Sequence, residues 1–175
     1  EEVGHNDVGP CFLGRCPQLR VLELDGNILR SVPRDSNLLP QLRELSLEGN
    51  AIHLDDEQVE RLGSLQHLQL LSLADNPLRR TISLENLPQL RYLNLSNTEQ
   101  TQLPPGLTTR TDLVVADLRD NRIRTLPEAF FTAPQWLNRV VLLDSNPLDE
   151  TTVERLQGWV FAGPGGTGLD EAAAA

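Results

Sequence analysis

Cysteine and histidine are the residues of this chain that could hold a metal or form a nucleophilic site, and both are scarce. The 175-residue sequence has two cysteines, Cys11 and Cys16, and three histidines, His5, His53 and His67. The histidines do not join the cysteines at the ligand spacing of a zinc site. No Ser/His/Asp or Cys/His set is evident, and no two carboxylates have a clear reason to be paired. We therefore expect no catalytic residue, metal site or cofactor in this chain.

Two short motifs look functional but fit a structural interpretation better. Asn94-Leu95-Ser96 matches a glycosylation sequon, yet Asn94 falls inside an expected strand and a three-residue pattern recurs by chance. The glycine-rich stretch 165–168 lacks the lysine of a phosphate-binding loop and follows no expected strand. We interpret it as part of a flexible linker.

The composition excludes some functions and points to a repeat. The chain has no lysine, and its 15 arginines stand against 25 acidic residues, for a net charge of −10. This balance argues against a nucleic-acid partner, because phosphate contacts need a basic face. The apolar runs are too short to span a membrane, so no membrane partner is expected. Leucine accounts for 34 residues, about one in five, which calls for a search for internal repeats.

The frame LxxLxLxxNx followed by an aliphatic residue recurs along the chain. Its first copy begins at Leu19, and its last, more degenerate copy contains Val141 and Leu143. The asparagine position of the frame falls at residues 27, 50, 76, 98, 121 and 146, and Thr98 replaces asparagine in the fourth copy. Such a pattern predicts an α/β solenoid, a leucine-rich repeat arc with a parallel concave β-sheet.

The elements that build this arc follow from elementary geometry. In LxxLxL the last two leucines lie two residues apart, so they point to one side of a short strand and are buried only when coils stack. We expect helices over 55–65, 126–131 and 151–160. The predicted organisation is an N-terminal flank at 1–18, six repeats at 19–148, a capping helix at 149–161 and a flexible tail at 162–175.

The concave face is the candidate functional surface. Residues at the third, fifth and seventh positions of the frame point away from the buried leucines. The early copies are acidic there and the later ones carry an apolar stripe, which is typical of a protein-binding surface. Acidic residues that only confer solubility are the alternative. The predicted binding residues are Glu23, Asp25, Glu44, Glu48, Leu70, Tyr92, Asn94, Val115, Asp117, Arg119, Val140 and Leu142.

The last third of the chain resembles one particular group. Residues 113–128, with the sequence LVVADLRDNRIRTLPE, and 145–151, with SNPLDET, resemble the last repeats of bacterial effectors of the novel E3 ubiquitin ligase (NEL, IpaH-like) family. The resemblance implies a module that selects a host protein substrate, secreted into the host cytoplasm, with a catalytic domain C-terminal to it. That domain carries a Cys-x-Asp motif, which neither Cys11-Phe-Leu nor Cys16-Pro-Gln matches.

Two alternatives remain open beside this resemblance. A stand-alone adaptor or scaffold, cytoplasmic and without an attached enzyme, would have the same repeats. An extracellular ectodomain is less favoured, because the disulfide caps of such leucine-rich repeat proteins usually hold more cysteines. We therefore expect free thiols at Cys11 and Cys16 rather than a disulfide.

Overall fold

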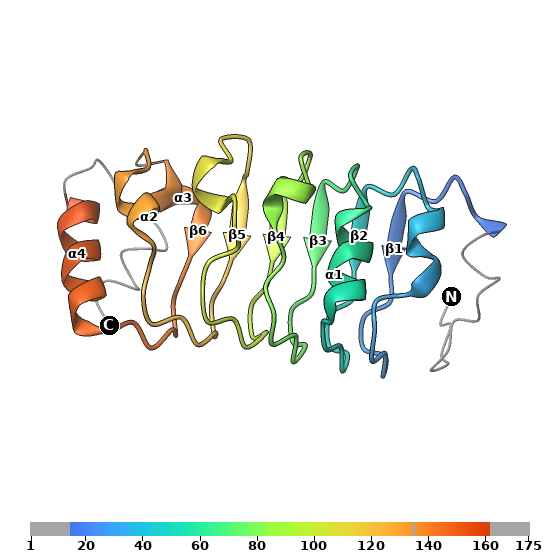
Figure 1. Cartoon of the computed structure of the whole chain (residues 1–175), viewed down its shortest axis with the longest axis horizontal. Coiled ribbons are helices and arrows are strands. Elements are labelled where there is room, and N and C mark those ends of the chain that lie inside the picture. The colour runs from blue at the N-terminus through green and yellow to red at the C-terminus, as the bar shows by residue number, and fades with distance from the viewer. Residues whose placement is uncertain (1–14, 135, 162–175) are drawn as a thin grey trace.

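A computed structural model describes residues 15–134 and 136–161. The chain forms an elongated stack of coils, each contributing one short strand to a parallel six-stranded sheet in the order β1 to β6 (Figure 1). The strands are β1 Val21–Glu23, β2 Glu44–Ser46, β3 Leu70–Ser72, β4 Tyr92–Asn94, β5 Val115–Asp117 and β6 Val141–Leu142. The expectations for 1–14 and 162–175, including Cys11 and the linker, lie outside the described residues.

The register of the sheet places the same frame position side by side in every coil. Leu22 pairs with Leu45, which pairs with Leu71, then Leu93 and Ala116. All five side chains are buried, so they form one continuous row of the core that no single coil could cover. The solenoid predicted from the leucine spacing is therefore confirmed.

The sixth coil departs from the prediction at Val140. A short helix, α3 Leu137–Val140, occupies the residues that would begin the strand, and β6 retains only Val141 and Leu142. Val140 is buried, 7% exposed, instead of lying open on the concave face. The expectation for this residue was wrong, because helical backbone turns its side chain away from the alternation of a strand.

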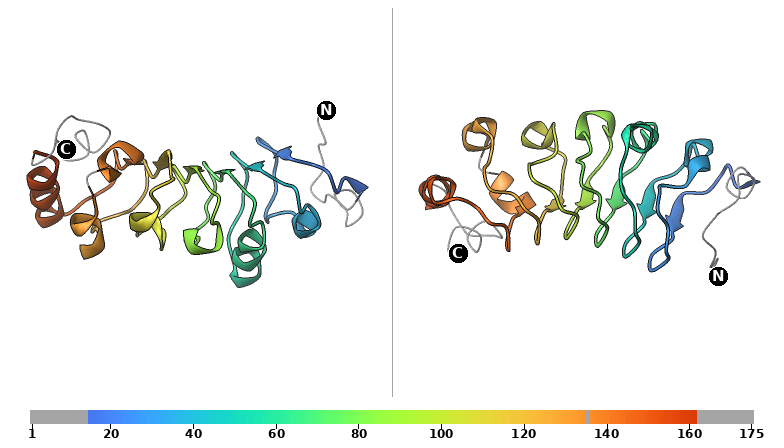
Figure 2. Two further views of the ribbon diagram at one scale, coloured as in Figure 1. Left: turned by 90° about the horizontal axis from the view of Figure 1, so that it is seen from above. Right: turned by 60° about the horizontal axis from the view of Figure 1, so that its bottom comes forward.

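Helices cover the side of the sheet opposite its open face (Figure 2). Helix α1, Asp56–Gly63, starts where the sequence predicted, since the carboxylate of Asp55 accepts from the backbone N–H of Gln58 at 2.8 Å. Helix α2, Glu128–Thr132, buries Phe130. The other coils return through short 3₁₀ helices at Arg34–Leu38, Leu84–Asn86 and Leu107–Thr109.

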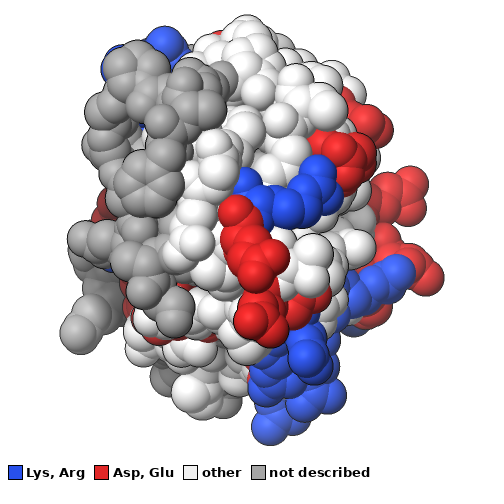
Figure 3. All heavy atoms as spheres, turned by 90° about the vertical axis from the view of Figure 1, so that its left-hand side faces the viewer, with Lys and Arg blue, Asp and Glu red and all other residues white. Residues whose placement is uncertain are grey.

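Helix α4, Glu150–Phe161, lies where the capping helix is expected. Its Leu156 is fully buried, and the ring of its Trp159 lies 5.1 Å from that of Phe130 in α2. Arg155 stacks over Phe131 and binds Glu128 at 2.9 Å. In Figure 3, which views this end of the molecule, basic and acidic side chains lie next to one another beside a broad uncharged area.

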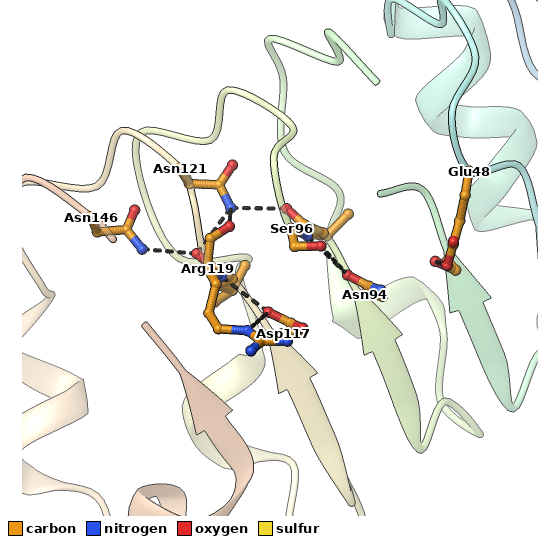
Figure 4. Close-up of polar contacts among 10 residues, drawn as sticks. Glu48, Asn94, Ser96, Asp117, Arg119, Asn121 and Asn146 are labelled. Atoms are coloured by element: carbon orange, nitrogen blue, oxygen red, sulfur yellow. Dashed lines mark hydrogen bonds and ion pairs between the residues drawn. The ribbon is translucent and has the colours of Figure 1, made fainter. Parts of the chain in front are cut away.

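Asparagines link successive coils just beyond the strands (Figure 4). Asn121 is typical: its amide donates to the carbonyls of Leu118 in its own coil and Leu95 in the preceding coil. Its Oδ1 accepts from the backbone N–H groups of Thr98 and Gln100. Each such side chain satisfies backbone groups that the turns leave without partners. Asn50, Asn76 and Asn146 bridge their coils in the same way.

This asparagine ladder has a gap between the coils of β3 and β4. The hydroxyl of Thr98 donates to Leu95 within its own coil, whereas the backbone N–H of Leu78 bonds locally to the carbonyl of Asn76. Gln100 takes the aliphatic position of the frame and is 2% exposed. Its Nε2 donates to the carbonyl of Arg80 at 2.9 Å, but its buried Oε1 has no hydrogen-bond partner.

Candidate protein-binding face

A hollow of about 290 Å³ lies over the open face of the sheet. We call it the sheet hollow, and most of the predicted binding residues lie around it. Its lining is formed by Glu23, Glu44, Ser46, Glu48, Leu70, Leu71, Ser72, Tyr92, Leu93, Asn94, Val115 and Asp117. The predicted residues Asp25, Arg119, Val140 and Leu142 are not part of this lining.

The apolar part of the sheet hollow follows the third position of the frame. Leu70 pairs with Tyr92, and Tyr92 with Val115, so the three side chains form a row across β3, β4 and β5. Tyr92 is 44% exposed, and Leu70 and Val115 are half-buried. These three residues belong to the predicted apolar stripe, whose other members are Val140 and Leu142, and they face solvent without a covering element among the described residues.

The acidic part lies over β1 and β2. Glu23 and Glu44 are exposed at the strands themselves, and Glu48 is half-buried just beyond β2, where its carboxylate accepts from the hydroxyl of Ser72. Within residues 15–134 and 136–161, no arginine lies within ion-pair distance of any of the three carboxylates. Their negative charge is therefore uncompensated by neighbouring side chains.

Asp25 has a local structural role. One of its carboxylate oxygens accepts from the hydroxyl of Ser46 at 2.7 Å and from the backbone N–H of Glu48 at 2.8 Å. These bonds join the first coil to the second at the end of the strands. Asp25 thus fixes the loop that carries Glu48, although Asp25 does not itself line the sheet hollow.

At the other end of the sheet hollow, the carboxylate of Asp117 is already paired with an arginine. Asp117 is buried, 8% exposed, because Arg119 folds back over it with contacts of 3.0 and 2.7 Å (Figure 4). Hydrogen bonding to Asp117, together with the charge of that carboxylate, raises the pKa of Arg119. Asn94 is also engaged, since its Oδ1 accepts from the N–H and hydroxyl of Ser96 at 3.0 and 2.8 Å.

The remaining candidate residues carry little chemistry. Cys16 is exposed and free, whereas Cys11 lies outside the described residues. In the described part of the chain, no group of three or more His, Cys, Asp or Glu residues is arranged to hold a metal ion. No helix in the same part is long and apolar enough to cross a membrane. Leu142 is half-buried on β6, beside Asp117 in the sheet register.

Comparisons with solved structures identify the fold. A leucine-rich repeat protein of Leptospira interrogans matches 90% of this chain at a TM-score of 0.60 and 22% identity, over 50% of its own length. The functional domain of InlJ from Listeria monocytogenes matches 89% of the chain at a TM-score of 0.59 and 18% identity, over 30% of its length. The chain has a leucine-rich repeat fold.

A plant receptor is also similar in structure to this chain. The peptide hormone receptor RGFR1, in complex with RGF2, matches 77% of the chain at a TM-score of 0.57 and 26% identity, over 22% of its own length. The chain thus spans half or less of the length of these proteins. The sequence matches no protein-family model, and no curated protein matches it significantly.

Ser46 and Ser72 also line the sheet hollow, although the prediction from sequence left them out of the candidate binding residues. Both occupy the fifth position of the frame, and their hydroxyls hold Asp25 and Glu48. The frame position was the available signal. The carboxylates that these serines bind could not be predicted in the same way. Each serine binds a carboxylate of the preceding coil that lies two positions beyond its own strand partner, and this pairing is known only once the register of the stacked strands is known.

Proposed function

We propose that this leucine-rich repeat domain binds a protein partner on the open face of its sheet. The observation that carries the proposal is the row of Leu70, Tyr92 and Val115 in the sheet hollow. Tyrosine is enriched at the energetic centres of interfaces, where it supplies a large apolar area with a polar tip. The solved complex of RGFR1 with RGF2 supports ligand binding by this class of fold.

The two halves of the sheet hollow would act differently in such binding. Burial of the apolar row supplies affinity, because water is displaced from Leu70, Tyr92 and Val115. The carboxylates of Glu23 and Glu44 lie at the edge of that row, where charge mainly raises the association rate and selects between partners.

The test is the double variant Tyr92→Ala with Val115→Ser. We expect it to lose a partner captured by the wild-type domain while its thermal stability stays nearly unchanged, because both side chains are solvent-accessible. The matched control is Val114→Ser, which alters another valine that is 45% exposed but lies outside the sheet hollow. Equal capture by both variants would refute the proposal, and a large loss of stability would show that Tyr92 and Val115 belong to the core.

At a finer level, we propose that the partner is the substrate of a bacterial ubiquitin ligase effector acting in host cells. The resemblance of residues 113–128 and 145–151 to the NEL family supports this. The coding sequence beyond Val160 tests it, since a helical domain with a Cys-x-Asp motif favours the ligase. A stop codon there favours the alternative, a stand-alone adaptor.

The absence of lysine fits the ligase proposal, although an arginine-preferring genome is a simpler explanation. A domain without ε-amino groups offers no lysine to its own catalytic domain. Arg34→Lys tests this, because it places a lysine on an exposed 3₁₀ helix with no change of charge. Self-modification at position 34 in the full-length ligase, and none in the wild-type repeats, is the expected result.

A further inference from the structure

We infer that the sheet hollow takes an extended peptide segment with a basic residue three positions away from an aromatic or large aliphatic one. This inference rests on the proposed function and adds the chemistry and spacing of the partner. It follows from two observations, the uncompensated carboxylates over β1 and β2 and the apolar row over β3 to β5.

The charge of the partner follows from what its docking would cover. Glu23, Glu44 and Glu48 all line the sheet hollow, and no arginine of the described chain pairs with them. A segment that covers these carboxylates removes water from them, and this is costly unless the segment supplies a cation. A neutral or acidic segment would remove water from the carboxylates without forming an ion pair in return.

The end of the sheet hollow over β4 and β5 does not require a cation from the partner. The carboxylate of Asp117 already receives two hydrogen bonds from Arg119, and the Oδ1 of Asn94 is occupied by Ser96. A second cation there would compete with Arg119. Only the side of the sheet hollow over β1 and β2 therefore requires a positive charge from the partner.

The spacing follows from sheet geometry. Glu44 and Tyr92 occupy the same frame position on β2 and β4, with Leu70 of β3 between them. Adjacent strands lie about 4.8 Å apart, so two steps cover about 10 Å. A segment in the extended polyproline II conformation advances about 3.1 Å per residue with three residues per turn, so side chains three positions apart span about that distance and point to the same side. A segment crossing the strands therefore reads basic-x-x-apolar, or the reverse order in the opposite direction.

The experiment is a selection of random twelve-residue displayed peptides on the intact domain. We expect enriched peptides to share a basic residue three positions from Phe, Tyr, Trp, Leu or Ile. One enriched peptide, synthesised with a fluorescent label, is then measured by anisotropy beside a version in which its basic residue is glutamine. The substitution should weaken binding about tenfold, as expected for the loss of one or two charge contacts, and high salt should reduce the difference.

Variants of the domain complete the test. Glu23→Gln with Glu44→Gln should lower the affinity for the labelled peptide about tenfold. The matched control is Glu60→Gln with Glu154→Gln, which removes the same charge from exposed positions on α1 and α4 and should leave binding unchanged.

The outcomes separate this inference from the proposed function. Enriched peptides that require Tyr92 but show no excess of basic residues would overturn the inference and leave the proposed function standing. Peptides that bind equally well to the Tyr92→Ala, Val115→Ser variant would overturn both. Equal loss of affinity in the control variant would mean that net charge alone attracts the peptide, which also overturns the inference.

Discussion

The asparagine ladder gives a sharp prediction about stability, and Asn121 is its best test. Asn121 is 6% exposed, and its side chain bonds to both its own coil and the preceding one. Asn121→Ala leaves the backbone N–H groups of Thr98 and Gln100 without their acceptor. It also leaves the carbonyl of Leu95 without the amide that bonds to it from Asn121.

The magnitude follows from these broken contacts. A buried donor or acceptor left unpaired costs about 1–3 kcal/mol. With two N–H groups affected, and some relaxation or water entry, we expect Asn121→Ala to lower the free energy of unfolding by about 3–5 kcal/mol. Asn27 is the matched control, because its half-buried amide donates only within its own coil, to Leu24 and Asp25. Asn27→Ala should cost about 1 kcal/mol or less.

The assay is denaturant unfolding followed by circular dichroism, with the slope of the transition compared between variants because repeat proteins can lose two-state behaviour. Hydrogen exchange adds a local readout, since the amides of Thr98 and Gln100 should lose protection in Asn121→Ala. Equal destabilisation by Asn121→Ala and Asn27→Ala would refute the reasoning. It would show that the cost is one of lost local turn structure rather than of contacts between coils.

Three further predictions concern other parts of the fold. Thr98→Asn with Gln100→Leu restores the repeat frame and removes a buried unpaired oxygen, so thermal and denaturant melts should show a gain of about 1–2 kcal/mol. Leu93→Ala, at a side chain that is 1% exposed, should lower the free energy of unfolding by about 2–5 kcal/mol in the same assay. Hydrogen bonds from Thr152 lower the pKa of Asp149 below 3.8, so Asp149 stabilises the fold above that value and loses this contribution as the pH falls through its folded pKa. Asp149→Asn keeps a capping oxygen, and acid titrations of stability should therefore show the gap between wild type and variant closing at low pH.

The frame of leucines and asparagines was enough to predict the stacked strands. The spacing of Leu45 and Leu47 predicts both as core, and both are fully buried. The start of α1 was also predictable, because acidic residues followed by an apolar periodicity indicate a helix N-terminus, and in the structure Asp55 is the N-cap of that helix. These features depend on local pattern alone.

The features that the sequence concealed depend on contacts between side chains. Asp117 sits at an outward position of the frame, yet it is buried because Arg119, two residues on, covers it. Val140 was misplaced because α3 replaces the start of the sixth strand, a tertiary choice that overrides the repeat period. The gap at Thr98 was visible as a substitution, but its effect on Leu78 needed the neighbouring coil.

That gap lies in the joint between the coils of β3 and β4, the same joint at which Leu70 pairs with Tyr92 in the sheet hollow. In a linear array, each joint couples only its two neighbours, so the weakest joint decides where the array opens first. We therefore predict that the coils of β1 to β3 and those of β4 to β6 unfold as two units, and that a ligand bound across both would couple their unfolding. Its presence would register as a more cooperative unfolding of the whole domain.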